Sequence, residues 1–267
     1  MVSLVPSLTE AVAVTAPGLL VGATDWCSHP AGLDVARIGG TKNPDVPAIL
    51  ALRPDLVLAN EEENRAPDLD ALRDGGAEVL VTEIRTLDQG LSALGDVLAA
   101  CGAPCRPRWL AEAEEAWATV EPVRDWPVGT GPVGDGMVAD GQVGDGPVGE
   151  RPVGGGITAV VPIWRRPWMV LGRDTFAGDL LARLGVRNLY ADHPERYPKI
   201  PLAELTEAGP RLVVLPDEPY RFTADDGPEA FPGAAAALVD GRMLTWYGPS
   251  LARAPRVLGR ALRAALR

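Results

Sequence analysis

The chain has few of the residues from which disulfide frameworks and protein metal sites are built. Its 267 residues include three cysteines, Cys27, Cys101 and Cys105, and two histidines, His29 and His193. These are too few for a disulfide framework, and their spacing fits no zinc motif. We therefore expect no metal ion held by the protein itself and no covalent cofactor, so that any metal would arrive inside a chelate.

Long apolar runs are also lacking. No stretch approaches the roughly 18 uninterrupted apolar residues of a membrane span, and no basic-then-apolar leader precedes Val2. We therefore expect a cytoplasmic protein without membrane insertion, which would be exported only if the start codon were misassigned.

Positive charge is scarce in the first half of the chain. Residues 1–126 hold 20 acidic and 9 basic residues, residues 127–156 hold 4 and 1, and residues 157–267 hold 12 and 15, for a net charge of -11. Phosphate backbones repel an acidic protein, so we expect no nucleic-acid partner. The slightly basic second half could face an anionic small molecule.

A proline- and glycine-rich repeat divides the chain. Residues 127–156 repeat with a period of five, as in Pro127-Val128-Gly129 and Pro132-Val133-Gly134, and contain no aromatic residue. Such a composition offers little helix propensity and little area to bury. We interpret residues 125–156 as a flexible insertion, with a turn-rich β-solenoid as the alternative.

Strand and helix patterns alternate on both sides of this repeat. Short apolar runs bounded by Pro, Gly or Asp predict strands at 2–5, 19–21, 56–59, 79–81, 157–163, 212–215 and 243–245. Helical patterns begin at Thr9 and cover 44–52, 67–73, 87–98, 175–184, 201–208 and 252–266. An Ala/Glu/Trp-rich stretch at 106–120 predicts one long helix leading from the first half to the second.

We therefore predict an α/β fold with two lobes, each with a mainly parallel sheet, joined by a long backbone helix. The boundaries are an N-terminal α/β lobe at 1–103, the connecting helix at 104–124, the insertion at 125–156 and a C-terminal α/β lobe at 157–267. In such an architecture the ligand site is expected in the cleft between the lobes, at the carboxyl ends of the strands.

Four segments carry a resemblance to a known family. They are Val2-Ser3-Leu4-Val5-Pro6-Ser7-Leu8-Thr9-Glu10, Gly22-Ala23-Thr24-Asp25-Trp26-Cys27, Gly39-Gly40-Thr41-Lys42-Asn43-Pro44 and the run from Ile49 to Ala59 that contains Arg53-Pro54-Asp55-Leu56-Val57. With them the chain resembles the substrate-binding proteins of cobalamin and ferric-siderophore ABC importers, the class III, helical backbone metal receptor family. The resemblance covers nearly the whole chain apart from the repeat. It implies two lobes with limited hinge motion and a corrinoid (cobalamin-like), siderophore or other metal chelate held between them without chemistry.

The resemblance also implies an acidic residue at the tip of each lobe, where family members meet the permease. The first position falls near Ala66, close to Glu61–Glu63, and the second falls near Gly248 and Pro249, with no acid nearby. We therefore expect a monomeric small-molecule-binding protein that does not dock to an ABC permease.

Candidate ligand-binding residues follow the predicted strands. Glu61–Arg65 could hydrogen-bond the amides of a corrinoid or clamp a cation, although a solvated turn with Asn64 capping the next helix is the alternative. Trp164–Trp168 suit a flat or anionic ligand, unless Trp168 packs into the core. Further aromatic residues follow the strands predicted at 212–215 and 243–245. They would either line a ligand pocket or pack as hydrophobic plugs that close the end of the lobe. The full set is Ser7, Trp26, Lys42, Asn43, Glu62, Asn64, Arg65, Trp164, Arg165, Trp168, Arg173, Glu218, Tyr220, Trp246 and Tyr247.

Enzymatic function finds little support in the sequence. The chain has no Gly-x-Ser-x-Gly motif, and no P-loop surrounds Lys42. The alternative hypothesis is a cytosolic enzyme acting on a small molecule in the same cleft, with Glu62 or the Cys27/His29 pair as the reacting groups. A third is an adaptor that recruits a protein through its acidic first lobe and the repeat.

Overall fold

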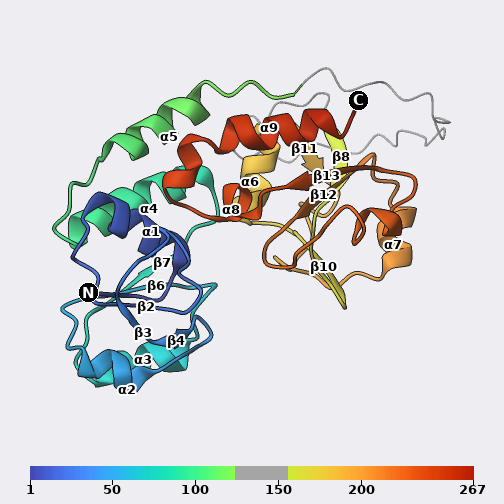
Figure 1. The fold of residues 1–267 in the computed structure, drawn as a ribbon. Helices are drawn as coiled ribbons and strands as arrows, with labels where there is room; N and C mark the ends of the chain where they lie inside the picture. The colour runs from blue at the N-terminus through green and yellow to red at the C-terminus, as the bar shows by residue number, and fades with distance from the viewer. Residues whose placement is uncertain (124–155) are drawn as a thin grey trace, which may run out of the picture.

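Two parallel β-sheets organise the chain, one on either side of the repeat. The structure is a computed structural model that describes residues 1–123 and 156–267 (Figure 1). The interpretation of the repeat therefore concerns residues that lie outside the described ones.

The first lobe is a five-stranded sheet with helices on both faces. The strand order is β3 (Ala36–Arg37), β2 (Gly22–Ala23), β1 (Val2–Ser3), β6 (Val57–Asn60) and β7 (Val79–Thr82), and all neighbours are parallel. Helices α1 (Pro6–Thr15) and α4 (Leu87–Ala100) pack on one face, and α2 (Val46–Ala51) and α3 (Ala66–Asp74) pack on the other. Burial on both faces explains why β6 is apolar at successive positions.

The second lobe repeats this arrangement with four parallel strands. Their order is β11 (Val186–Asn188), β8 (Ile157–Val160), β12 (Leu212–Pro216) and β13 (Ala235–Val239). Along β12, Leu212 and Val214 face α6 (Phe176–Arg183), α8 (Gly241–Thr245) and α9 (Ala254–Ala264). Val213 and Leu215 face the opposite side, which α7 (Leu202–Glu207) covers.

Smaller elements complete the lobes. Two antiparallel hairpins pair β4 (Gly39–Gly40) with β5 (Asn43–Pro44) and β9 (Pro162–Arg165) with β10 (Trp168–Val170). The 3-10 helices are η1 (Pro228–Ala230) and η2 (Pro249–Ala252). Within residues 1–123 and 156–267, no helix is both long enough and apolar enough to cross a membrane.

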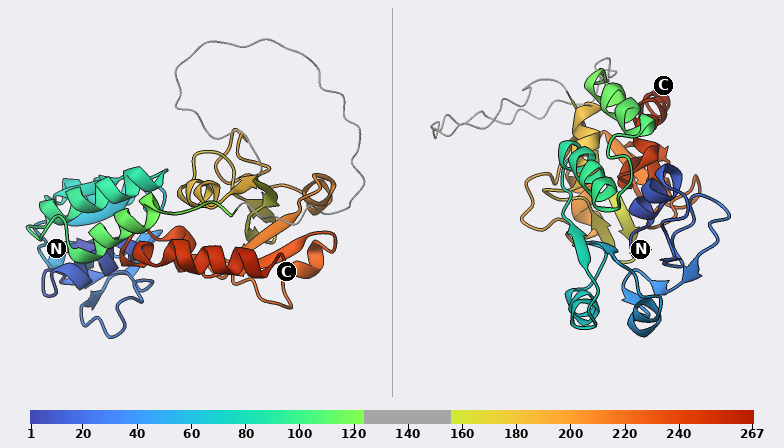
Figure 2. Two further views of the ribbon diagram at one scale, coloured as in Figure 1. Left: turned by 90° about the horizontal axis from the view of Figure 1, so that it is seen from above. Right: turned by 90° about the vertical axis from the view of Figure 1, so that its left-hand side faces the viewer.

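One hydrophobic core joins the two lobes. It runs from Leu8 and Leu94 on the first lobe to Leu180 and Leu258 on the second, without interruption at the junction. Helix α5 (Arg108–Ala118) lies within the predicted 106–120 range and packs along η2 in the C-terminal part of the chain (Figure 2). There the indole nitrogen of Trp117 donates to the carbonyl oxygen of Leu251 at 3.1 Å. The lobes are therefore fixed to each other by packing, with α5 and η2 forming part of the seam.

The prediction of a strand at 243–245 is wrong, because these residues form helix α8. The Asp240 carboxylate caps this helix by accepting from the backbone N–H of Met243 at 3.2 Å. A three-residue apolar run does not distinguish strand from helix. The edge strand is instead β13, whose alanines gave no strand signal. Strand β2 also begins after the predicted range of 19–21.

Candidate functional site: the cleft between the lobes

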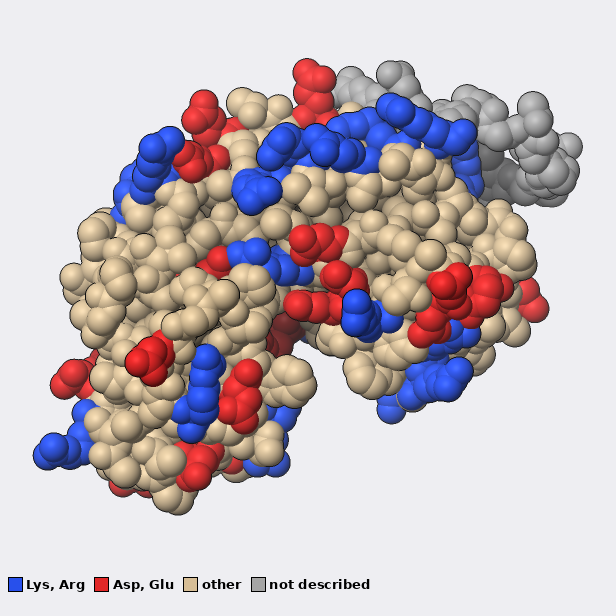
Figure 3. Space-filling view, in the orientation of Figure 1, with Lys and Arg blue, Asp and Glu red and all other residues tan. Residues whose placement is uncertain are grey.

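A hollow separates the lobes on the side of the molecule away from α5 and α9 (Figure 3). We call it the interlobe cleft. Loops that follow strands reach it from both lobes. Glu61–Glu63 come directly after β6, Arg85 comes after β7, and Glu218 comes after β12. The carboxyl ends of the strands thus supply the polar residues, as expected for parallel sheets.

Two asparagines fix the loop that carries the three glutamates. The Asn64 carboxamide accepts from the backbone N–H of Asn60 at 2.9 Å and donates to the Thr41 carbonyl at 3.0 Å, while Asn60 donates to Thr82. Both side chains are buried. Asn64 therefore shapes the site from within the fold and caps no helix, and a direct ligand contact by Asn64 is not supported. Arg65 also turns away, pairing with Asp68 at 2.9 Å on the surface.

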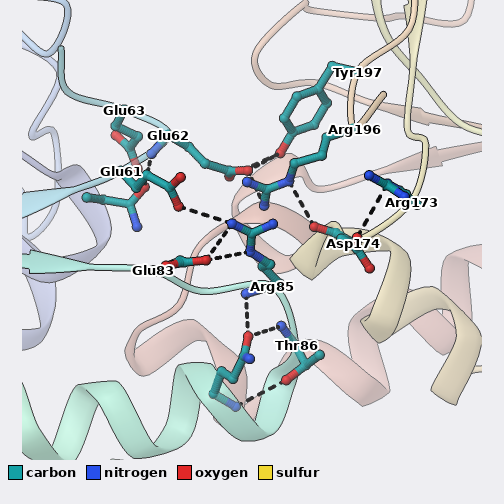
Figure 4. A network of polar contacts seen from close by, with 12 residues as sticks. Glu61, Glu62, Glu63, Glu83, Arg85, Thr86, Arg173, Asp174, Arg196 and Tyr197 are labelled. Atoms are coloured by element: carbon teal, nitrogen blue, oxygen red, sulfur yellow. Dashed lines mark hydrogen bonds and ion pairs between the residues drawn. The ribbon is translucent and has the colours of Figure 1, made fainter. Parts of the chain in front are cut away.

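Glu62 connects the first lobe to the second. The Tyr197 hydroxyl donates to both of its carboxylate oxygens at 3.1 Å, and Arg196 forms an ion pair with it (Figure 4). Lys42, on the β4–β5 hairpin, donates to the Glu62 backbone carbonyl. Burial is the main cause that raises the pKa of Tyr197, and the nearby Glu62 carboxylate is the second cause. The phenol therefore stays protonated and remains a hydrogen-bond donor. The Glu62 carboxylate of the first lobe is thus the anionic partner of Arg196 and Tyr197 of the second lobe.

Glu63 makes a second polar contact between the lobes. The Tyr247 hydroxyl donates to its carboxyl group at 3.3 Å. Burial raises the pKa of Glu63 from its ordinary value of 4.5 to about 7. Burial and the same carboxyl group raise the pKa of Tyr247, whose ring packs edge-on against Phe176 at 5.7 Å between centroids. Near neutral pH the Glu63 carboxyl is therefore close to half protonated.

Alternating charges continue along the cleft beyond Glu62. Arg85 donates to Glu83 at 2.8 Å and lies 3.4 Å from Glu61 (Figure 4). Across the cleft, the Arg196 guanidinium also donates to the Asp174 carbonyl at 3.0 Å. Arg173 lies 3.6 Å from the Asp174 carboxylate. These arginines are therefore paired with acceptors of the protein itself.

Two tryptophans lie at the edge of the cleft. The Trp246 indole donates to Glu218 at 3.1 Å, and the ring of His29, from the first lobe, packs edge-on against it at 5.5 Å. Burial raises the pKa of Glu218. Trp26 is 68% exposed and lies over Gly40 of the β4–β5 hairpin. Trp246 therefore joins the lobes, whereas Trp26 offers an uncovered ring face.

The β4–β5 hairpin needs glycine to place Lys42 and Asn43. Gly39 has a φ of +82°, and a Cβ there would lie 3.0 Å from the Asn43 carbonyl oxygen. Asn43 itself is exposed. The glycine pair therefore serves the turn that brings Lys42 to Glu62.

The predicted aromatic and basic residues of 164–173 are mostly engaged within the second lobe. Trp168 stacks on Phe222 at 6.1 Å and packs in the hydrophobic cluster beneath the β9–β10 hairpin. Trp164 packs edge-on against Tyr220 at 5.5 Å. Arg165 is paired with Asp226 and Glu229. Trp168 thus has the packing role given above as the alternative, and Arg165 is not available as a free cation for a ligand.

The charge of the cleft differs from the expectation of a basic second wall. Its ionisable groups comprise the acids Glu61, Glu62, Glu63, Glu83, Asp174 and Glu218 and the bases Lys42, Arg85, Arg173 and Arg196. Carboxylates therefore outnumber the cations around them. Such a surface favours a ligand whose periphery donates hydrogen bonds, since carboxylates only accept them.

The residues named for an enzyme do not form a reacting pair. The Cys27 thiol is buried against the hydroxyls of Thr9 at 3.0 Å and Thr24 at 3.1 Å, and burial raises its pKa, so it is not a thiolate. His29 instead contacts Ser28 and Trp246. Ser7 is buried where α1 meets Gly248, at which a Cβ would lie 3.2 Å from the Ser7 carbonyl oxygen.

Three important residues were missed by sequence reasoning. Arg85, Arg196 and Tyr197 lie in polar segments outside the predicted helices and strands. Only the position of Arg85 just after a strand could have indicated its role. Arg196 and Tyr197 reach Glu62 across 134 and 135 residues of sequence, which no local pattern reveals.

Comparison with known proteins places this geometry in a structural class. No protein-family model matches the chain, and the search of curated proteins found no match. Among solved structures, the vitamin B12-binding protein BtuF of Vibrio cholerae superposes with a TM-score of 0.69 at 17% identity, covering 99% of this chain and 96% of that one. The periplasmic heme-binding protein RhuT from Roseiflexus sp. RS-1 superposes with a TM-score of 0.72 at 20% identity, covering 100% of this chain and 98% of that one. A periplasmic heme-binding protein from Pseudomonas aeruginosa superposes with a TM-score of 0.66 at 23% identity, covering 99% of this chain and 91% of that one.

The chain has the class III periplasmic-binding-protein-like fold. The resemblance inferred from the sequence and the α/β fold class are thereby confirmed. These neighbours of the same fold are described as binding proteins, in agreement with the expectation of a non-enzymatic protein.

The expected cytoplasmic location is wrong. The matching proteins from V. cholerae, Roseiflexus and P. aeruginosa are all described as periplasmic. Gly248, near which the second tip acid was expected, is buried against the Ser7 carbonyl oxygen of the first lobe.

Proposed function

We propose that the protein is an exported substrate-binding protein that holds one metal chelate in the interlobe cleft and serves a membrane importer. The observation that carries the proposal is the convergence of both lobes on Glu62, which Arg196 and Tyr197 meet from the opposite side. A polar floor built from two lobes suits a ligand large enough to touch both. Neighbours of this fold described as vitamin B12- and heme-binding add support.

Within the chelates, the cleft favours a corrinoid over an anionic ligand. Its arginines are already paired. Glu61 and Glu218 contact Arg85 and Trp246, but a carboxylate has further lone pairs that can accept from peripheral amide N–H groups. Propionates or catecholates would instead have to displace Glu62 from Arg196. A cobalamin-like corrinoid is therefore the first ligand to test, followed by heme and a ferric siderophore.

Two other surface hollows fit this role less well. One of about 490 Å³ lies between α1 and the start of α5, and one of about 250 Å³ lies beside Pro17 and Pro30. The residues that line them come from the first lobe and α5 alone. A ligand bound there would not contact the second lobe.

Isothermal titration calorimetry with cyanocobalamin, hemin and ferrichrome tests the proposal. We expect one chelate to bind at a single site, and Trp246→Leu to weaken binding about tenfold through loss of an aromatic contact at the cleft. Trp109→Leu is the matched control, because Trp109 is also half-buried with a hydrogen-bonded indole but lies on α5. Absence of binding by all three chelates, or equal weakening by both substitutions, would contradict the proposal.

A further inference from the structure

Helix α9 carries a stripe of arginines on the side of the molecule opposite the interlobe cleft (Figure 3). The stripe consists of Arg256, Arg260 and Arg263 on α9, with Arg253 directly before the helix and Arg267 after its end, all exposed. Their spacing alternates between three and four residues. At 3.6 residues per turn this spacing confines the three arginines within the helix to an arc of about 60° on one helix face.

Nothing nearby in the sequence balances this charge. No acidic residue follows Asp240, although the whole chain has a net charge of -11. In the part of the chain that the structure describes, the ion pairs involve none of the five. The stripe is therefore a positive face on an otherwise acidic protein.

Helix stability does not account for the arrangement. An arginine in the last turn, such as Arg263, is favourable beside the negative end of the helix dipole, but Arg253 and Arg256 lie at the positive end, where a cation is unfavourable. The opposite face of α9 is fixed in the core by Leu258 and Leu262. The helix thus cannot turn its apolar side toward a membrane and presents only its charged side.

We infer that the α9 arginine stripe docks a carboxylate-rich segment of a partner protein. Guanidinium groups pair bidentately with carboxylates, and a straight row of them matches a segment lying along the helix. A flat anionic bilayer fits less well, because α5, on which Glu112 and Glu115 are exposed, lies on the same side of the molecule as α9 (Figure 1). Acidic side chains are also visible on that side (Figure 3). Since the stripe faces away from the cleft, the partner and the chelate would bind at the same time.

Fluorescence anisotropy with a labelled helical peptide tests the inference. The peptide carries glutamates at the same alternating spacing of three and four, and a second peptide has the same composition in scrambled order. We expect the full-length protein to bind the patterned peptide preferentially, with affinity falling as salt is raised. The variant Arg256→Glu/Arg260→Glu should lose about tenfold in affinity, because two attractive pairs become repulsive.

A matched charge reversal separates the stripe from net charge. Arg53→Glu/Arg187→Glu changes the net charge equally at exposed positions elsewhere and should bind like the wild type. Circular dichroism and the thermal midpoint establish that each variant is folded. Equal loss in both variants, equal binding of the scrambled peptide, or binding only to phosphatidylglycerol vesicles would each overturn the inference.

Discussion

At the scale of single residues, the Glu63 carboxyl is the group most sensitive to pH. Its pKa is about 7 in the folded protein, against an ordinary value of 4.5, because it is buried. Between pH 4.5 and about pH 7, Glu63 therefore keeps its proton in the folded protein, whereas it has lost it in the unfolded chain. The raised pKa of Glu63 favours the folded state fully below about pH 4.5, and this stabilisation is lost as the pH rises to about 7. The free energy of unfolding changes by at most about 3 kcal/mol over this range.

We therefore predict that Glu63→Gln flattens the pH dependence of stability between pH 4.5 and 7. Glutamine stays neutral throughout this range and can still meet the Tyr247 hydroxyl. Urea unfolding at a series of pH values measures the change, with the exposed Glu78→Gln as control. An unchanged pH profile in Glu63→Gln, or the same flattening in the control, would refute this assignment.

Tyr197→Phe tests the contact between the lobes at Glu62. The substitution removes the hydroxyl that donates to the Glu62 carboxylate but leaves the ion pair with Arg196. We predict a loss of about 1 kcal/mol in the free energy of unfolding, measured in urea. Tyr190→Phe, near Glu204 instead, should have a smaller effect; no difference between the two would argue against a stabilising role for the contact.

At the scale of elements, helix α4 of the first lobe depends on a residue of the second. Asp179 on α6 accepts from the backbone N–H of Leu87 at 2.9 Å, and Arg183 bridges Asp179 to Asp88. Asp179→Ala should lower the free energy of unfolding by about 1–2 kcal/mol, since it leaves a first-turn N–H without its acceptor. Differential scanning calorimetry compares the thermal midpoint of Asp179→Ala with that of Asp192→Ala, a control in an exposed loop. Equal midpoints for the two variants would contradict a stabilising role for the Asp179 carboxylate.

The same helix illustrates what sequence could predict. Thr86 and Gln89 form a capping box, and the leucine spacing marks the buried face, so α4 follows from local chemistry. Strands β6 and β12 are equally clear because they are apolar on both faces. Helix α8 was not predicted, since its start depends on Asp240 and on Asp217, which lies after another strand.

For the cleft, sequence located the loops but not the partners of their side chains. Glu62 could be proposed because it follows the recognisable strand β6, whereas Trp246 was proposed after a strand at 243–245 that is in fact helix α8. The contacts of Glu62 with Arg196 and of Trp246 with His29 arise only when the two lobes come together. Packing within the second lobe turned Trp168 and Arg165 toward their own lobe, which a motif of tryptophans and arginines could not reveal.

At the scale of the whole molecule, the continuous core predicts that the two lobes unfold together. Leu94, Trp117, Phe176 and Tyr247 belong to one hydrophobic cluster, and a Cβ at Gly90 would lie 3.1 Å from the Phe176 ring. Differential scanning calorimetry should therefore give a single transition whose calorimetric and van't Hoff enthalpies agree. Two separate transitions would indicate that the lobes are independent.

The central claim is that one metal chelate binds between the lobes. Native mass spectrometry of the protein mixed with equimolar cyanocobalamin, hemin and ferrichrome tests it most directly. We predict one retained chelate per chain, reduced in Trp246→Leu and unchanged in Trp109→Leu. A spectrum with no bound chelate, or with several bound in proportion to concentration, would contradict the account.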